Sequence, residues 1–370
     1  MSALYIGLMS GTSLDGVDGV LVDFSQGAPQ VLSHQARPFD AALKAELMAL
    51  NTAGANELHR GALAANALVH VYAQVVHDLL LATAQPASAI QAIGAHGQTV
   101  RHQPGLFDGV GYTLQLNNPS LLAELTGIAV VADFRSRDVA AGGQGAPLVP
   151  VFHQGIFGKA QQTVAVLNIG GIANVSVLSA QGDVVGFDCG PGNALMDFWC
   201  LQHTGQPYDD NGQWGRSGQV ITPLLHAFMQ EPFLQQPPPK STGRDLFHPA
   251  WLATHLACFD NVAPADVQAT LTEFTAQACV NDVQRHAPDA CELIVCGGGA
   301  LNSLLMARLR AGLPNSCRVV SSAERDLPPL QVEATAFAWL ARQTVHGLPG
   351  NAPKVTGAKG ARILGGIFPA

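Results

Sequence analysis

The residue types best suited to chemistry near the amino terminus form one glycine-rich segment, Gly11-Thr12-Ser13-Leu14-Asp15-Gly16-Val17-Asp18. Small residues let a backbone approach a ligand, and successive N–H groups with Thr and Ser hydroxyls form a concave site for anions. Carboxylates beside such a site would repel phosphate unless a cation bridges them. The segment therefore predicts nucleotide phosphates with Mg²⁺, for which Asp15 is the candidate protein contact. A structural turn held by Asx hydrogen bonds is the alternative.

A second candidate group is the carboxylate of Asp188, within Gly186-Phe187-Asp188-Cys189-Gly190-Pro191-Gly192-Asn193. It ends an apolar run and faces two glycines and a proline. A carboxylate at the end of a buried strand is held rigidly yet is open to a ligand, as a general base must be. The alternative role is the N-cap of the following helix, which Asn193 could also fill.

Two more turns are rich in glycine: Gly170-Gly171 within residues 168–174, and Gly297-Gly298-Gly299 within residues 296–302. The second follows an apolar run and opens a helix, so a flat or anionic group could approach its N-terminus. Each turn alone is unspecific. The chain has no G-x-x-x-x-G-K-[ST] segment and no G-x-G-x-x-G at a strand–helix junction. Any nucleotide phosphates must therefore be held by hairpins.

The histidines and cysteines fall into two groups. His96 ends an apolar run beside a Gly-Gln pair, so we expect it to face a ligand. His59, His70 and His77 lie on one predicted helix and are expected on its solvated face. No Cys or His spacing indicates a zinc site, and the seven cysteines, which form no C-x-x-C pair, are expected to be reduced and mostly buried.

Alternating strands and helices must position these groups. Predicted strands at 4–9 and 17–24 enclose the first glycine-rich segment, and strands at 164–168 and 175–178 enclose the second. The other main elements expected are strands at 90–95, 128–134, 184–187, 293–296 and 319–321, and helices at 39–50, 56–84, 120–126, 264–286 and 333–345. This alternation predicts an α/β protein, and the repeated strand–turn–strand opening indicates two related halves.

Composition narrows the class of protein. A chain of 370 residues with 48% hydrophobic and 12% charged residues fits two compact domains. The net charge is −8, and the 19 Lys and Arg are scattered along the sequence. They form no basic stripe of the kind that binds nucleic acid, so nucleic-acid binding is not expected. The longest uncharged apolar run, 164–180, is interrupted by Gly and Asn, and no leader pattern begins the chain. We expect a cytoplasmic protein without a membrane span.

The order of these motifs resembles the sugar-kinase, chaperone-ATPase and actin superfamily. More narrowly, the chain resembles the anhydro-N-acetylmuramic acid kinase family from residue 6 to about 367. The segments that carry this resemblance are 9–18, 94–100, 133–138, 141–150, 168–174, 187–193 and 239–244, with Glu333 and 336–340. Two places depart from the family pattern: Asn117-Asn118 stands where Gly-Asp is expected, and Leu301 where His is common.

The resemblance implies an α/β, two-domain actin-like (ribonuclease H-like) fold with ATP and sugar in the interdomain cleft. The first domain would comprise residues 1–130 and 347–370, and the second residues 131–346. It also implies ATP and Mg²⁺, a homodimer, and the conversion of 1,6-anhydro-N-acetylmuramic acid, ATP and water to N-acetylmuramic acid 6-phosphate and ADP in peptidoglycan recycling.

Carried over motif by motif, Asp188 matches the catalytic base. Arg135 and Glu333 match sugar-contacting positions, and His96 lies in a substrate-side motif. The expected ATP-binding residues are those of segment 11–18 with Gly170, Gly171, Gly297 and Gly298. A kinase of an ordinary hexose or amino sugar is the main alternative, because it would share the fold and the ATP loops. A non-enzymatic ATPase switch would need an effector module, and a two-carboxylate glycosidase would leave the phosphate-type loops unexplained.

Overall fold

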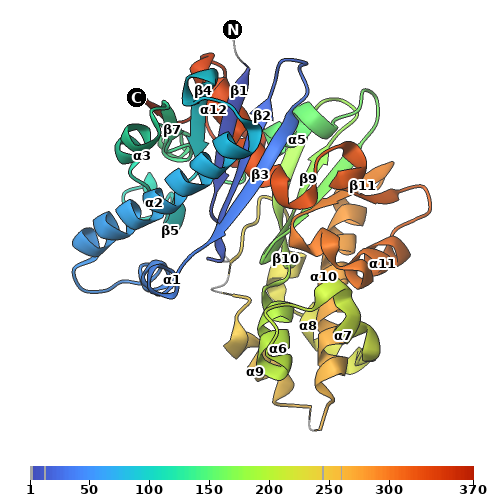
Figure 1. Ribbon diagram of the computed structural model, residues 1–370. Coiled ribbons are helices and arrows are strands. Elements are labelled where there is room, and N and C mark those ends of the chain that lie inside the picture. Colours follow the sequence, from blue (N-terminus) through green and yellow to red (C-terminus); the bar gives the residue numbers. More distant parts are fainter. Residues whose placement is uncertain (1–2, 12–13, 244–245, 260) are drawn as a thin grey trace. The chain divides into compact units, whose positions relative to one another are not determined.

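The computed structural model describes residues 3–11, 14–243, 246–259 and 261–370. The chain divides into two compact units (Figure 1), Met1–Phe152 with Gln331–Ala370, and His153–Leu330. Both boundaries differ from the expected ones at 130 and 346. Strand β7 (Val130–Ala132) is hydrogen-bonded into the sheet of the first unit, and helix α12 (Val332–Val345) packs on that sheet as well. Tertiary contacts therefore assign both elements to the first unit.

The first unit contains a six-stranded mixed sheet in the order β13-β7-β4-β1-β2-β3. Strands β1, β2 and β3 are antiparallel neighbours, whereas β4 and β7 run parallel to β1. A separate hairpin is formed by β5 and β6. Besides β7, the strands span Leu4–Met9 (β1), Gly16–Asp23 (β2), Gln30–Pro38 (β3), Ile90–Ala95 (β4), Gln98–Pro104 (β5), Gly111–Leu116 (β6) and Gly366–Phe368 (β13).

The second unit repeats this topology. Its sheet has the order β10-β9-β8-β11-β12, with β8, β9 and β10 antiparallel and with β11 and β12 parallel to β8. Both units thus contain the same five-strand pattern, the ribonuclease H-like arrangement, so the expected α/β class and the expected repeat are confirmed. The strands span Val164–Ile169 (β8), Ile172–Leu178 (β9), Val184–Pro191 (β10), Glu292–Cys296 (β11) and Arg318–Ser321 (β12).

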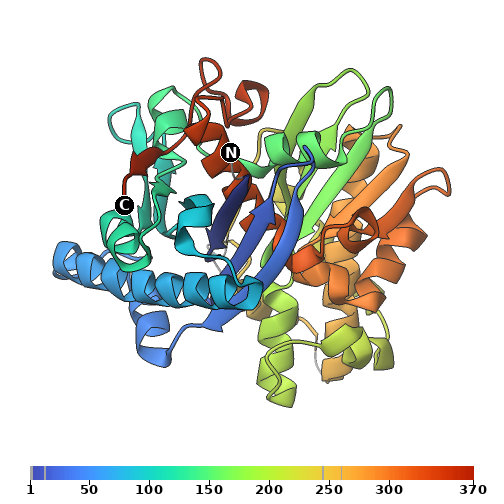
Figure 2. The ribbon, with the colours of Figure 1, turned by 45° about the horizontal axis from the view of Figure 1, so that its top comes forward.

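Helix α2 (Glu57–Thr83) covers one face of the first sheet (Figures 1 and 2). Its buried side chains recur three or four residues apart, as an amphipathic helix requires, at Leu68, Tyr72, Val75 and Leu79. The three histidines of this helix are exposed, which confirms their predicted solvated face. The other helices of this unit are α1 (Ala41–Ala49), α3 (Pro119–Thr126), α4 (Ser136–Ala140), α13 (Pro353–Thr356) and α5 (Val149–Phe157), which contains the first unit boundary.

Two glycines let helix α12 lie directly on the first sheet. Gly7 of β1 and Gly94 of β4 are paired in register. A Cβ atom at Gly7 would overlap the carbonyl oxygen of Ala334, and one at Gly94 would overlap that of Phe337. The helix backbone therefore touches the strands, and this contact sets the position of Glu333 in the first turn of α12.

The core of the second unit is built around helix α10 (Pro264–His286), which matches its predicted range and packs on β9 and β10. An aromatic cluster in this core joins Phe274 of α10 to Phe228, Phe247 and Trp251, with ring centroids 5.2–6.4 Å apart. The remaining helices are α6 (Ala194–Thr204), α7 (Gln213–Ser217), α8 (Thr222–Met229), α9 (Pro249–Leu256) and α11 (Ser303–Gly312).

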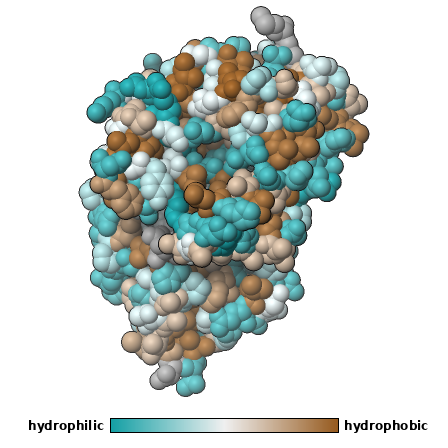
Figure 3. Space-filling model, turned by 90° about the vertical axis from the view of Figure 1, so that its left-hand side faces the viewer, coloured by the Kyte–Doolittle hydropathy of each residue, from teal (hydrophilic) through white to brown (hydrophobic). Residues whose placement is uncertain are grey.

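Short 3₁₀ helices complete the chain: η1 (Ala87–Ala89), η2 (Asp210–Gly212), η3 (Pro232–Gln235), η4 (Gly298–Leu301), η5 (Ser322–Arg325) and η6 (Pro329–Gln331). No helix among the described residues combines the length and the apolar character needed to cross a membrane. The face drawn in Figure 3 carries hydrophilic and hydrophobic side chains in small, interspersed patches. Five of the seven cysteines are buried.

Candidate active site

Three of the expected motifs follow strands of the first sheet that run in the same direction. Because β1, β4 and β7 are parallel, their carboxyl ends lie at one edge of the sheet, where α/β sheets commonly bind ligands. Gly11 follows β1, His96 follows β4, and Arg135 comes three residues after β7. The topology thus brings together segments that are far apart in the sequence.

His96 and Arg135 are direct partners. The Nε and Nη2 atoms of Arg135 lie 3.2 and 2.9 Å from Nε2 of His96, and Nη1 donates to the carbonyl oxygen of Gly145 at 2.8 Å. Burial, together with the charge of Arg135, lowers the pKa of His96 to about 3. The imidazole is therefore neutral at physiological pH, with Nε2 as the acceptor.

Glu333 belongs to the same group of side chains. Burial lowers the pKa of Arg135 to about 10, and the negative charges of Glu333 and Asp138 oppose this shift. The three residues expected to contact sugar thus form one electrostatically linked cluster in the first unit.

The glycine-rich segment after β1 forms the predicted hairpin, since β1 and β2 pair directly. Thr12 and Ser13 lie outside the described residues. The side chains of Leu14 and Val17 are buried in the core of the first unit, so only their backbone could meet a ligand. Gln98 donates from Nε2 to the carbonyl oxygen of Gly11 at 3.1 Å.

Gly16 has a structural reason of its own. The sequence predicts that a branched side chain at this position would fill space needed by a nucleotide phosphate. In the structure a Cβ atom would instead overlap the backbone of Arg37 and Pro38 on β3. Gly16 is required by the close pairing of β2 and β3.

The two carboxylates of this hairpin already have side-chain partners. Asp15 lies 3.2 Å from Nζ of Lys44, and Asp18 lies 2.9 Å from Nε2 of His34. The Asp15 side chain is 74% exposed, so its ion pair can exchange readily. Within the described part of the chain, no three His, Cys, Asp or Glu side chains form a metal-binding group. These residues fit an Mg²⁺ ion that is held mainly by nucleotide phosphates and contacts a carboxylate such as Asp15.

The second unit gathers its motifs in the same way. Strands β8, β10 and β11 run in one direction, so their carboxyl ends share an edge. The Gly170 carbonyl accepts from the N–H of Asn193 at 2.7 Å, and the Gly171 carbonyl accepts from that of Gly192 at 2.9 Å. Gly297 has φ 77°, and a Cβ atom there would press on the end of β8. The turns that contain Gly170, Gly171, Gly297 and Gly298 therefore pack together.

Asp188 lies on β10 and is held by a separate loop. Its Oδ2 atom accepts from Oγ of Ser241 and from the backbone N–H of Thr242, both at 2.9 Å. Its own N–H donates to the carbonyl oxygen of Lys240 at 3.1 Å. Oδ1 accepts no hydrogen bond from any described residue. The carboxylate is thus fixed through one oxygen while the other can bind a water or substrate.

The protonation of Asp188 follows from these surroundings. Burial raises its pKa above the ordinary value of an aspartate, whereas the bonds from Thr242 and Ser241 and the charge of Lys240 oppose the rise. Asn193, not Asp188, occupies the N-cap position of α6. The capping alternative for Asp188 is therefore excluded.

Sequence reasoning assigned no role to two sets of residues in these sites. Ser241 and Thr242 stood in a family-like segment, but their contact with Asp188 depends on folding. The hydroxyl of Tyr72 on α2 lies 3.1 Å from both Oγ of Ser10 and the N–H of Gly97. A tyrosine on the apolar face of a helix was the available signal, because a buried phenol needs a polar partner.

The first of the two departures from the family pattern, Asn117-Asn118, has a local explanation. Asn118 is the N-cap of α3 and accepts from the N–H of Leu121 at 3.1 Å, a role that Asp also fills. Asn117 donates to the carbonyl oxygen of Ala95 at 3.3 Å. Leu301 is 55% exposed at the end of η4.

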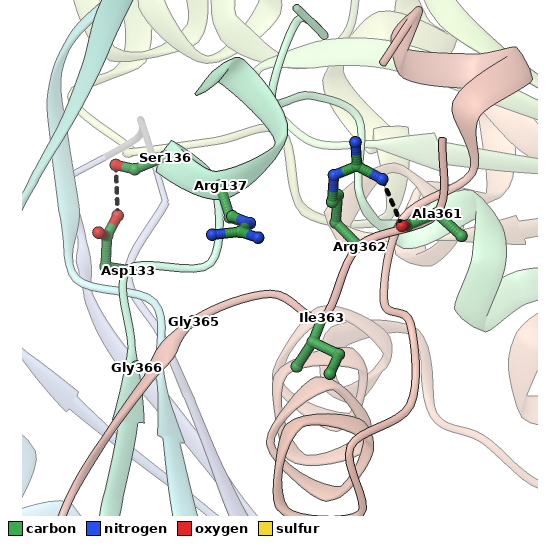
Figure 4. A pocket seen from close by; sticks show the side chains of 8 residues that line it. All are labelled: Asp133, Ser136, Arg137, Ala361, Arg362, Ile363, Gly365 and Gly366. Atoms are coloured by element: carbon green, nitrogen blue, oxygen red, sulfur yellow. Dashed lines mark hydrogen bonds between the residues drawn. The ribbon is translucent and has the colours of Figure 1, made fainter. Parts of the chain in front are cut away.

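A pocket of about 680 Å³ lies beside the carboxyl end of β7, in the first unit. Figure 4 shows Asp133, Ser136 and Arg137 on one side and Arg362 with Ile363 on the other. None of the expected site residues lines it, and Arg135 is directed to His96 and Gly145. The pocket is distinct from the His96–Arg135 cluster.

The family model described as anhydro-N-acetylmuramic acid kinase matches residues 3–370. The protein of that name from Variovorax paradoxus is 63% identical over 372 residues, covering 99% of both chains. The one from Cupriavidus pinatubonensis is 57% identical over 368 residues, covering 99% of this chain and 98% of its own.

Solved structures resemble the chain only distantly. An activator of 2-hydroxyisocaproyl-CoA dehydratase from Clostridium difficile has a TM-score of 0.49 at 12% identity, covering 93% of this chain and 96% of its own. A ROK family glucokinase from Streptomyces griseus has a TM-score of 0.42 at 13% identity, covering 92% and 99%. The sequence relationship, in contrast, extends from end to end, and this chain belongs to the anhydro-N-acetylmuramic acid kinase family.

Proposed function

We propose that this chain catalyses the ATP-dependent hydrolytic ring opening and 6-O-phosphorylation of 1,6-anhydro-N-acetylmuramic acid. The products would be N-acetylmuramic acid 6-phosphate and ADP, in peptidoglycan recycling. The observation that carries the proposal is the family match along residues 3–370. The Asp188 carboxylate is hydrogen-bonded through Oδ2, and its Oδ1 is available to take a proton, which suits the general base that this reaction needs.

The substrate itself dictates an unusual use of the base. In a 1,6-anhydro sugar O6 is bonded to C1, so no O6 proton is available for removal. Asp188 would instead take a proton from water through Oδ1, and the water oxygen would bond to C1 as the C1–O6 bond breaks. The electron pair released on O6 would attack the γ-phosphorus, and the bond from phosphorus to the β–γ bridging oxygen would break to release ADP. One base is sufficient for this sequence, and the proton is left on Asp188.

The sugar would be oriented by His96, Arg135 and Glu333. The guanidinium of Arg135 is held by His96 and Gly145, which reduces the freedom it would lose on binding a polar ligand. The pairing also keeps the neutral imidazole of His96 in one orientation. These contacts would place C1 where the water attacks.

The nucleotide would be held by backbone groups of segment 11–18 and by the glycine turns at Gly170-Gly171 and Gly297-Gly298. Small residues at these turns allow close approach to phosphate and to the adenosine. Bound Mg²⁺ would stabilise negative charge on the transferring phosphoryl group, with Asp15 as the candidate protein contact. We further propose that the enzyme acts in the cytoplasm, where ATP is available, as a homodimer, which light scattering of the purified protein would test.

A coupled ADP-release assay tests the reaction. The enzyme with Mg-ATP is given 1,6-anhydro-N-acetylmuramic acid, free N-acetylmuramic acid or no sugar. Rapid ADP release is expected only with the anhydro sugar. Equal or faster turnover of the free sugar would instead support the alternative, an ordinary amino-sugar kinase.

Labelled water tests the bond-making sequence. In H₂¹⁸O the label is expected at the C1 hydroxyl of the product and not in its phosphate ester. Because the free sugar exchanges its anomeric oxygen slowly with water, the product is quenched early and compared with unlabelled product placed in H₂¹⁸O. Label in phosphate with none at C1 would contradict the mechanism.

A further inference from the structure

A fully buried lysine lies next to the segment that holds Asp188. The Nζ atom of Lys240 is 2.8 Å from Oδ2 of Asp282 on α10, and the two side chains are 0% and 3% exposed. The ammonium also lies 5.1 Å from the ring centroid of Phe233 and 5.6 Å from that of Phe187. No other described residue gives either charged group a hydrogen bond.

Stability alone does not explain this ion pair. Removing two charges from water costs about as much as their attraction returns, and apolar replacements of buried pairs are often neutral or stabilising. Burial raises the pKa of Asp282 despite the opposing effect of Lys240, which shows that the surroundings are poorly solvated. We therefore expect the buried Lys240–Asp282 pair to have a role other than stabilising the core.

The connectivity of the chain indicates that role. The carbonyl oxygen of Lys240 accepts from the N–H of Asp188 at 3.1 Å. The next two residues, Ser241 and Thr242, supply both donors to Oδ2 of Asp188. Three consecutive residues therefore contact Asp188, two at its carboxylate and one at its backbone, and the first of the three is anchored to α10 by its side chain.

We propose that the Lys240–Asp282 pair is a positioning device for the base, holding residues 240–242 against Asp188 so that Oδ2 is fixed and Oδ1 is presented to water. The ammonium also supplies a positive charge that favours the ionised carboxylate. This inference rests on the proposed function of Asp188. Lys240 and Asp282 are positioning residues, because neither is placed to touch substrate.

The neighbouring elements β9 and η3 bring no charge to Asp188. Asn174 is the register partner of Asp188 on β9 and is uncharged. Helix η3 carries no ionisable side chain. On α10, Arg285 and His286 act electrostatically on Asp282. Burial raises the pKa of the Cys189 thiol, which keeps it neutral.

The test compares single variants with a charge-free double variant. Lys240→Met leaves the Asp282 carboxylate buried without its partner, and Asp282→Asn does the same to Lys240. Both should lower the melting temperature. Lys240→Met/Asp282→Leu removes both charges with side chains of suitable size, so its melting temperature should return to within a few degrees of the wild-type value.

The decisive measurements are made on this double variant. The expected result is a kcat at least about 10-fold below wild type, a KM for ATP within about twofold, and a kcat profile whose acidic limb moves to higher pH. The titration of the Asp188 carboxylate, followed by ¹³C NMR and assigned with Asp188→Asn, should move in the same direction. A stable double variant with wild-type kcat, pH profile and Asp188 titration would overturn the proposal.

A matched control and a substrate-free readout separate the possible failures. Lys159→Met removes a partner 2.9 Å from the buried Glu292 in the same unit, so it should lower stability without changing kcat or the Asp188 titration. If the wild-type enzyme does not turn over the anhydro sugar, the proposed function fails. The NMR titration still decides whether the ion pair controls Asp188, and an unchanged titration in the double variant then rejects the inference separately.

Discussion

Two nitrogens of Arg135 converge on a single atom of His96, the Nε2, at 3.2 and 2.9 Å. The lone pair of Nε2 must be available for this contact, so the imidazole carries its proton on Nδ1. A third nitrogen of Arg135 is bound to the Gly145 carbonyl. The guanidinium is thus locked in position by one side chain and one backbone group.

Arg135→Lys should therefore weaken sugar binding although the charge is kept. A lysine ammonium cannot make three directed bonds in this plane. We expect KM for the anhydro sugar to rise about 10-fold or more, with KM for ATP within about twofold, as measured by steady-state kinetics. Arg37→Lys is the control, because Arg37 forms an exposed ion pair with Asp78 in the same unit. An unchanged KM for the sugar in Arg135→Lys would remove Arg135 from the proposed site.

Asp188→Asn should keep the fold but lose turnover. The amide oxygen of Asn can still accept from Ser241 and Thr242, whereas the basic oxygen is lost. General-base catalysis is worth about 10²–10⁴-fold, so kcat should fall by that factor while Mg-ATP still binds in calorimetry. Asp183→Asn, in the exposed turn before β10, should retain wild-type kcat. If Asp188→Asn retains more than about a third of the wild-type kcat, Asp188 is not the base.

Acid should destabilise the protein through its buried histidines. Burial lowers the pKa of His96 and of His153 to about 3, from an ordinary value of 6.5. Below pH 6.5 these histidines are protonated in the unfolded chain but stay neutral in the folded chain. The stabilisation present above pH 6.5 is therefore lost as the pH falls toward 3. At pH 5 each histidine should cost about 2 kcal/mol of stability relative to pH 8.

Melting temperatures measured from pH 8 to 5 test this dependence. They should decline below about pH 6.5, and His153→Gln should reduce the slope relative to wild type at each pH. His59→Gln, at an exposed position of α2, should leave the slope unchanged. A flat profile from pH 8 to 5 would contradict the assignment of neutral, buried imidazoles.

Gly94→Ala should destabilise the first unit. The added methyl group would meet the carbonyl oxygen of Phe337, forcing α12 away from β1 and β4. Overpacking of this kind typically lowers the free energy of unfolding by about 1–3 kcal/mol. Because the neighbour here is a backbone atom that cannot rotate away, we expect a loss of about 2 kcal/mol or more. Gly155→Ala is the matched control, because nothing lies within 4 Å of its added Cβ in helix α5 and the change should be neutral or stabilising. Equal unfolding free energies for the two variants would show that α12 is not in backbone contact with the strands.

The sequence by itself determined the local elements and the residues at their ends. Pro264 begins α10 and an apolar period runs to His286, and the run of residues 90–95 is a buried strand, so both ranges were predicted as found. Local preference decides such elements, because their caps, turns and periodicity lie within a few residues of one another. The same reasoning predicted site roles for Asp188 and His96, because in the sequence each polar side chain follows an apolar run; in the structure Asp188 lies within β10 and His96 follows β4.

Only the tertiary structure decided which distant residues meet. The bond from Thr242 to Asp188 joins residues 54 positions apart, and no local pattern encodes it. The same is true of the unit boundaries, which depend on the pairing of β7 and the packing of α12. Gly16 shows the difference at one position: the glycine-rich segment predicted a close approach to phosphate, and the fold adds a close approach to the backbone of β3. A glycine in the sequence indicates that another group approaches the backbone closely, and only the folded chain shows which group that is.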